Sequence, residues 1–213
     1  MDADCYRIPA GPSAGEFRDR GSKFVAVLEY VRSEAEALAI QERQRIAHPK
    51  CNHHCYAYRI GEGRDRWRAN DDGEPSGTAG KPILGQIDKA GLSDVVIVVS
   101  RYFGGTKLGA SGLINAYREA AVVALARVET QLQHITVPIV LHFGYELMTP
   151  VMSALSALDL PMTEQDFGAR ARVQVDVPRS KGVEIRRELL ARIGGVYLEE
   201  VTEDFRVEGL EVS

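Results

Sequence analysis

Cysteine is scarce in this sequence, and the three cysteines that it has, Cys5, Cys51 and Cys55, form an odd set. An odd number in a chain of 213 residues does not fit the disulfide framework of a secreted protein. The first eight residues are polar and mixed in charge, without the apolar segment of a secretory signal peptide. Apolar runs such as residues 95–99 are far too short to cross a bilayer. We therefore expect a protein of the reducing cytoplasm with no membrane contact.

An excess of basic residues is also missing. Lysine and arginine number 26 against 30 aspartates and glutamates, which gives a formal net charge of −4 with histidine neutral. General binders of polyanions are usually strongly basic, so the charge of the whole chain argues against that class and leaves room only for a local basic patch. Hydrophobic residues make up 45% of the chain and charged residues 26%, which is typical of a globular protein with a buried core.

The chain contains no tandem repeat or low-complexity tract, but two blocks of it differ in texture. Up to about residue 128 the sequence is rich in glycine and carries unusual motifs, whereas from about residue 134 strand and helix patterns alternate plainly. We predict two domains, residues 1–131 and residues 132–213. The length allows two small domains of this kind.

The first block predicts an α+β domain. Ser33 and Glu36 have the spacing of a capping box and place a helix start there, while His48 followed by Pro49 ends that helix. A continuous β-branched run at 95–99 is typical of a strand buried on both faces. The remaining predicted elements are strands at 5–8, 24–31, 53–60 and 64–69, a helix at 82–90 closed by Gly91, and a long helix at about 111–127.

The second block has the order β-α-β-β-α-β, which is the ferredoxin-like plan. Strands are predicted at 135–143, 161–167, 171–177 and 196–201, with helices after residue 149 and at about 181–193. We expect Thr149 to cap the first of these helices, with Pro150 at the first helical position. The strand at 171–177 alternates apolar and polar residues, so one of its faces is buried.

A loop rich in glycine and acidic residues covers residues 71–82 and is the densest cluster of polar groups. It is not a Walker A loop, because prolines stand where that motif needs glycine and a hydroxyl residue, and it lacks the spaced acids of an EF-hand. One interpretation is a binding loop; the other is a rigid connection whose glycines supply positive φ and whose acids cap turns. The candidate binding residues are Asp71, Asp72, Glu74, Ser76, Thr78 and Lys81.

A second glycine loop follows the buried strand and leads into the long helix. Its candidate binding residues are Arg101, Tyr102, Gly104, Gly105 and Lys107. A helix start behind glycines favours an anion, which Arg101 and Lys107 could hold. The alternative is that Tyr102 and Phe103 belong to the core and that the cations pair with acids of the first loop. We expect the two loops to meet in space.

Three other clusters are weaker candidates. His48, Cys51, His53, His54 and Cys55 lie within eight positions, but neighbouring residues on a strand face opposite ways, so we predict no metal site and no cofactor. Cys55 and His53 are a candidate nucleophile pair, but residues two apart on a strand lie on one face without a preset hydrogen bond. The alternating arginines at 64, 66 and 68 favour a solvated strand face over a nucleic-acid contact, because acids lie beside them.

Long strings of the first block resemble the IMPACT/YigZ family closely in order and spacing. They are HHCYAYR at 53–59, DDGEPSGTAGKPIL at 71–84, RYFGGTKLG at 101–109 and GLINAY at 112–117, within a signature that covers roughly residues 20–125. The resemblance implies a first domain with the left-handed βαβ topology of a small-subunit ribosomal protein and elongation factor G, and a ferredoxin-like second domain. Relative to the family pattern, Ser111 stands in place of glycine and Asn115 in place of arginine.

The resemblance also implies a link to translation. Eukaryotic members regulate translation by competing for the ribosome-associated activator of the amino-acid-starvation kinase, through an N-terminal domain that this chain lacks. No catalytic residues are implied. We therefore expect a non-enzymatic binding protein that contacts the ribosome, RNA or a translation regulator through its first domain. The alternatives are a hydrolase that uses the acidic loop with a divalent metal ion, and a pure protein-interaction module.

Overall fold

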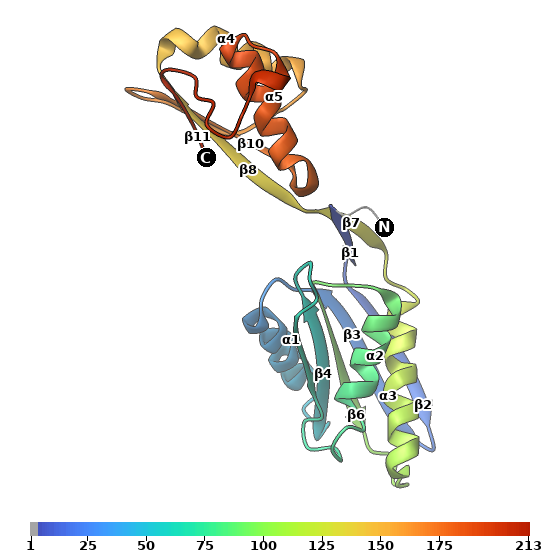
Figure 1. Ribbon diagram of the computed structural model, residues 1–213. Coiled ribbons are helices and arrows are strands. Elements are labelled where there is room, and N and C mark those ends of the chain that lie inside the picture. The colour runs from blue at the N-terminus through green and yellow to red at the C-terminus, as the bar shows by residue number, and fades with distance from the viewer. Residues whose placement is uncertain (1–3) are drawn as a thin grey trace. The chain divides into compact units, whose positions relative to one another are not determined.

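The computed structural model describes residues 4–213 and divides into two compact units (Figure 1). One unit is Cys5–Gln133, and the other consists of His134–Ser213 together with Asp4. The first three residues of the predicted first domain lie outside the described residues. Within 4–213, no helix combines the length and the apolar character needed to span a membrane.

A five-stranded antiparallel sheet forms the centre of the first unit, in the order β2-β3-β6-β4-β5. Its strands are β2 (Ser13–Asp19), β3 (Ser22–Tyr30), β4 (His53–Ile60), β5 (Arg66–Asn70) and β6 (Val95–Tyr102). The β-branched run predicted as a buried strand is β6, which pairs with β3 on one side and β4 on the other. Seven of its eight residues are buried, as expected for a central strand.

Helices cover both faces of this sheet (Figure 1). α2 (Gly80–Ala90) and α3 (Gly109–Leu125) lie on one face and α1 (Glu34–Ala47) on the other. The side chains of β6 alternate between the two resulting cores: Ile97 packs into the core under α2 and α3, and Val96 and Val98 pack into the core under α1. Because successive side chains of a strand point to opposite faces, β6 contributes alternate residues to each of the two cores.

The predicted helix boundaries of the first unit follow local chemistry. The hydroxyl of Ser33 accepts a hydrogen bond from the backbone N–H of Glu36 at 3.2 Å, which caps α1 as the capping-box spacing predicted. α1 ends at His48, and α2 ends at Gly91, which has a φ of +67° in the left-handed region that favours glycine. Local sequence was sufficient to predict these helix ends, because each capping group bonds to the backbone of its own helix.

Two strands of the first unit had no predicted counterpart. The edge strand β2 is polar and contains Gly15, where an added Cβ would lie 2.5 Å from Val123 Cγ1 of α3. This glycine lets the strand and the helix approach closely, although glycine in a strand pattern usually argues against a strand. β1 (Cys5–Pro9) and β7 (Thr130–His134) form a separate two-stranded sheet. β7 has a polar sequence and is defined by its pairing with β1 rather than by its own pattern.

The second unit has a four-stranded sheet in the order β11-β8-β10-β9. Its strands are β8 (Thr136–Phe143), β9 (Met162–Phe167), β10 (Ala171–Pro178) and β11 (Leu210–Val212), and its helices are α4 (Met148–Ala157) and α5 (Gly182–Gly194). The inward residues of β10, such as Val173 and Val175, pack with Leu141, Phe143 and Leu189 in one core. Short 3-10 turns occur at Tyr145–Leu147, Arg179–Lys181 and Leu198–Glu200.

Two predictions for the second unit are wrong. α4 begins at Met148 after Leu147 without a side-chain cap, so Thr149 and Pro150 lie inside the first turn. Proline is tolerated there because the first-turn N–H groups have no partner within the helix. The predicted strand at 196–201 is also wrong, because that segment holds a 3-10 turn, and the last strand of the sheet is β11, which pairs with the edge of β8 opposite β10. The strand was predicted too early because the segment contains apolar residues such as Tyr197. In the structure the side chain of Tyr197 is exposed and does not pack in the core.

Candidate functional site

The first acid of the glycine loop, Asp71, caps the start of α2. Its carboxylate accepts backbone N–H groups from Gly77 at 2.8 Å, Ala79 at 2.9 Å and Gly80 at 2.8 Å. Burial acts to raise the pKa of this carboxyl, but the three donors outweigh it, and the net pKa lies below the ordinary value. Because Ala79 offers α2 no side-chain cap, Asp71 supplies one from outside the helix.

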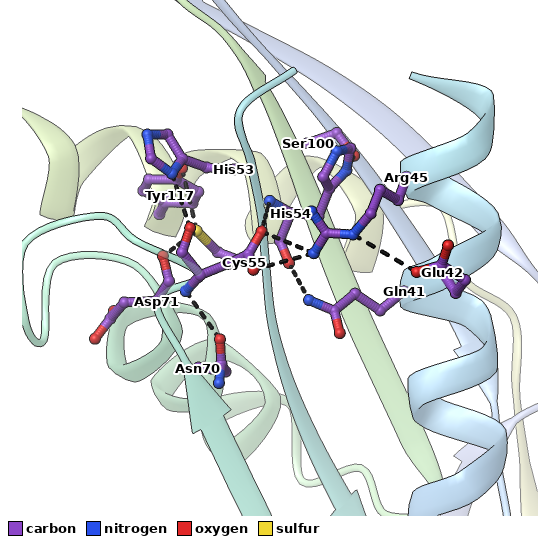
Figure 2. A network of polar contacts seen from close by, with 11 residues as sticks. Gln41, Glu42, Arg45, His53, His54, Cys55, Asn70, Asp71, Ser100 and Tyr117 are labelled. Carbon is purple, nitrogen blue, oxygen red and sulfur yellow. Dashed lines mark hydrogen bonds and ion pairs between the residues drawn. The ribbon is translucent and has the colours of Figure 1, made fainter. Parts of the chain in front are cut away.

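The second acid, Asp72, joins the loop to α1 and β4. Both of its carboxylate oxygens accept from Arg45 Nη2, at 3.0 and 3.1 Å, and Oδ2 also accepts the backbone N–H of His54 at 2.6 Å. Figure 2 shows these polar contacts together. Arg45 extends from α1 on one side of the group, and Asn70 and Cys55 lie on the opposite side. Asn70 Oδ1 accepts the backbone N–H of Asp72 at 2.8 Å. Asp72 is thus held by the protein itself.

The third acid, Glu74, is buried and bonds to two further elements, and through Tyr117 it is linked to β4. Its Oε1 accepts from Arg101 Nη1 of β6 at 2.7 Å and from the hydroxyl of Tyr117 of α3 at 2.8 Å. The Tyr117 oxygen lies 3.3 Å from the sulfur of Cys55 in β4. Burial is the largest cause that raises the pKa of both the Cys55 thiol and the Tyr117 phenol, and the charge of Glu74 raises both further. The hydrogen bond with Tyr117 acts to lower the pKa of Cys55 but does not outweigh burial. The ion pair joins the first glycine loop to the start of the second, as expected for loops that meet.

The second glycine loop rests against the turn between β2 and β3. The backbone N–H of Gly104 donates to Ser22 Oγ at 3.2 Å, and a Cβ on Gly104 would lie 1.9 Å from the carbonyl carbon of Gly21. Only glycine permits this approach of two backbones. Tyr102 contacts Nδ1 of His48 through its hydroxyl at 2.8 Å, and Lys23 Nζ lies 4.5 Å from the centre of its ring.

Burial divides the predicted site residues into two groups. Glu74, Thr78 and Arg101 are buried, and Asp71, Asp72 and Tyr102 are partly buried, with the partners described above or, for Thr78, a hydrogen bond to the carbonyl of Pro75 at 2.6 Å. The exposed group is Ser76, Lys81, Gly104, Gly105 and Lys107. The idea that Phe103 belongs to the core is wrong, because its side chain is 59% exposed.

The carboxylates of the first loop do not converge on a shared position. Asp71 bonds to backbone N–H groups, Asp72 to Arg45 and Glu74 to Arg101. Paired acids that hold a divalent ion must direct free oxygens at one point. Across residues 4–213, no three or more histidine, cysteine or acidic side chains are grouped so that they could hold a metal ion.

The histidines and cysteines at 48–55 serve separate contacts. His54 is fully buried with Nδ1 2.8 Å from Ser100 Oγ, whereas His53 Nδ1 lies 2.8 Å from the carbonyl oxygen of Asp72 (Figure 2). The raised pKa of the buried Cys55 thiol keeps it protonated and therefore a poor nucleophile. On β5, Arg68 pairs with Glu34 at 2.7 Å, which fits a solvated strand face.

Sequence reasoning missed the partners that hold these groups. Arg45 is 27 positions from Asp72 and Ser100 is 46 from His54, and no local spacing relates such pairs. The pairing register of β4 and β6, which places His54 opposite Ser100, is what brings the second pair together. The one sequence signal for this contact is the alternation of side chains along each strand, which could have suggested that His54 and Ser100 lie on the same face of the sheet.

His54 predicts a dependence of stability on pH. Burial, and then the charge of Arg45, lowers its pKa in the folded state from the ordinary value of 6.5. The unfolded chain therefore binds the proton more readily, so the stabilisation is complete above about pH 6.5 and is lost as pH falls towards the folded-state pKa. We expect urea unfolding, followed by the fluorescence of the sole tryptophan Trp67, to show falling stability from pH 7.5 to 5.5.

A His54→Asn variant should flatten this dependence, because asparagine can still bond to Ser100 but does not titrate. His142→Asn, in the second unit, is the matched control and should leave the pH dependence of the first unit unchanged. An equally steep pH dependence in His54→Asn would contradict the assignment to His54.

Comparison with known proteins identifies several relatives. Residues 20–125 match the family described as the Impact N-terminal domain. The IMPACT family member YigZ of Escherichia coli strain K12 is 32% identical over 188 residues, which cover 87% of this chain and 92% of YigZ. A crystal structure of a hypothetical protein matches with a TM-score of 0.70 at 29% identity, over 98% of this chain and 96% of that one. The two-domain translational regulator Yih1 is 31% identical, covering 54% of this chain and 47% of its own, with a TM-score of 0.36.

Proposed function

Because the chain belongs to the IMPACT family, we propose that it is a translation-linked binding protein without catalytic activity that contacts the ribosome, RNA or a translation regulator. The sequence relationship to Yih1, a translational regulator, supports the link to translation. Binding is favoured over catalysis by one observation: every carboxylate of the acidic loop already has a partner within the protein. A hydrolase that used these acids with a metal ion would need their oxygens free.

Finer features of the fold are part of this proposal. The second unit has its helices between β8 and β9 and between β10 and β11, and the order β11-β8-β10-β9 supports a ferredoxin-like domain. In the first unit, β3 and β4 both run antiparallel to β6 between them and are connected through α1, which supports the βαβ topology of the ribosomal-protein type. We place the domain boundary after residue 131 and the protein in the cytoplasm.

The predicted site residues divide into two roles in this proposal. The exposed members Ser76, Lys81, Gly105 and Lys107 are the ones available to a partner, whereas the backbone of Gly104 packs against Gly21. The partly or fully buried members Asp71, Asp72, Glu74 and Arg101 hold the loops in place through the contacts already described. The proposed site therefore belongs to the first unit, on a surface held by the buried Glu74–Arg101 pair and the partly exposed Asp72–Arg45 pair.

Sedimentation with ribosomes tests the proposed function. We expect the intact chain to co-sediment with ribosomes at about 50 mM salt and to be released at about 200 mM, because contacts to phosphate weaken steeply with salt over that range. Treatment with RNase separates contact with RNA from contact with ribosomal protein. A chain that stays in the supernatant at low salt, and captures no RNA or translation regulator, would contradict the proposal.

A further inference from the structure

Three connections of the first unit meet at one end of its sheet (Figure 1). Lys23 at the start of β3 pairs in register with Tyr102 at the end of β6. The hydroxyl of Tyr102 contacts His48, which ends α1, and Gly104 donates to Ser22 of the β2–β3 turn. The β2–β3 turn, the segment after α1 and the second glycine loop therefore form one continuous surface, although they lie far apart in the sequence.

This end of the sheet is positively charged in a chain whose net charge is −4. Residues 16–23, 48–52 and 103–108 contain five lysines and arginines against two acids, a net charge of +3. The two acids are Glu16, which pairs with Arg18 at 2.7 Å, and Asp19. Arg20, Lys50 and Lys107 are exposed, and none of them has a carboxylate partner within residues 4–213. Their charge is directed at solvent rather than at the protein.

The acids of the first glycine loop do not cancel this charge. Asp72 is neutralised by Arg45, and Glu74 is buried against Arg101. Asp71 is bonded to three backbone N–H groups. The negative charge of these three acids is therefore largely compensated by their partners within the protein. The electrostatic potential at this end of the sheet is set by Arg20, Lys50 and Lys107.

An exposed aromatic ring lies in the second glycine loop, which carries Lys107. Phe103 is 59% exposed, and the guanidinium of Arg101 lies 5.6 Å from the centre of its ring. The next residues leave the backbone open: Gly105 has a φ of +86°, and no atom lies within 4 Å of where its Cβ would be. α3 then begins at Gly109 without a side-chain cap, so no side chain at its start satisfies its first N–H groups.

We propose that this surface, consisting of Arg20, Lys50, Phe103 and Lys107 and here called the basic end, binds single-stranded RNA. The three cations contact phosphates and Phe103 stacks on an unpaired base. A positive surface with an exposed aromatic ring is the combination that binds single strands without reading their sequence. Paired A-form RNA keeps its bases stacked, so it cannot offer one to Phe103. The inference rests on the proposed function, which selects RNA as the polyanion.

The test is the affinity of the intact chain for fluorescein-labelled U12 RNA, measured by fluorescence anisotropy at several salt concentrations. The triple variant Arg20→Glu/Lys50→Glu/Lys107→Glu is expected to bind at least about tenfold more weakly and to lower the slope of log K against log salt by about 2, since each phosphate contact on a single strand contributes about 0.7. Phe103→Ala is expected to weaken binding about tenfold and leave the slope unchanged.

A matched control carries the same change in net charge away from the basic end. Arg66→Glu/Lys89→Glu/Arg192→Glu replaces three exposed cations elsewhere, and Arg66 pairs with Ile60 at the opposite end of β4. This variant is expected to retain most of the affinity and the full salt slope. Circular dichroism and thermal unfolding of each variant establish that the fold is intact.

The other outcomes separate this inference from the proposed function. If the chain sediments with ribosomes but does not bind U12, or if the basic-end variants bind U12 like the unchanged chain, the basic end is wrong and the proposed function stands. If polyglutamate displaces U12 and Phe103→Ala has no effect, the surface is a site for an acidic protein, which also overturns the inference. Failure to bind ribosomes, RNA and regulators alike would remove the proposed function itself.

Discussion

Replacing Glu74 by glutamine is expected to lower the free energy of unfolding of the first unit by about 3–5 kcal/mol, the usual cost of leaving one member of a buried ion pair without its partner. Glutamine has nearly the shape of glutamate, so the change leaves no cavity and can still accept from Tyr117. Arg101, with a side chain only 8% exposed, would keep its charge without a carboxylate. Urea unfolding followed by Trp67 fluorescence measures the change.

Two further variants isolate the cause. In Glu74→Gln/Arg101→Met both charges are removed, and we expect this double variant to recover more than half of the lost stability, because well-packed apolar groups can replace a buried pair. Arg18→Ala breaks the exposed pair with Glu16 and should leave unfolding unchanged, because solvent screens that pair. If Glu74→Gln unfolds at the same urea concentration as the unchanged protein, the buried pair does not hold the loop.

Replacing Gly80 by alanine is expected to cost about 3 kcal/mol, while the same change at Gly85 in the same helix should stabilise the protein by up to about 1 kcal/mol. A Cβ on Gly80 would lie 2.4 Å from the backbone nitrogen of Asn70, and backbone atoms cannot turn aside as a flexible side chain does. No atom lies within 4 Å of a Cβ on Gly85, so alanine there only improves helix propensity.

The pair is compared by urea unfolding with circular dichroism at 222 nm and with Trp67 fluorescence. Both substitutions add the same methyl group to α2, so a difference in sign between them isolates the contact with Asn70. Equal effects at the two positions would mean that the start of α2 moves freely away from the end of β5, and would contradict the close packing described above.

The sequence predicted the elements whose signals are local and missed those that depend on distant partners. β4 and β6 were found because His53–Ile60 and the run at 95–99 have the composition of buried strands. β2 and β7 were missed because both are polar and are stabilised by what they pair with or pack against. β11 was placed too early because its three residues are too short for any periodicity, and only pairing with β8 defines it.

The candidate site shows the same limit. Motif and spacing placed Asp71, Glu74 and Arg101 in one region, and the first loop does contact the second through the Glu74–Arg101 pair. Residue type could not tell which of these groups face solvent, because that depends on packing from α1 and α3. Phe103 lies in the string RYFGGTKLG, but its residue type suggested a core position, and Lys50 lies in no motif. Only the meeting of three connections brings the segment of Lys50 to the loop that holds Phe103 and Lys107.

The position of β6 between two cores has a consequence for how the first unit unfolds. Removing either helical layer would expose alternate residues of the same strand, so neither α1 nor the α2–α3 pair can detach without exposing apolar side chains of β6 to water. Partial opening is therefore costly, and the two layers are expected to be lost together in one cooperative transition. The amides of β6 would then exchange with solvent only when the whole unit opens, which makes this strand the slowest-exchanging segment of the unit.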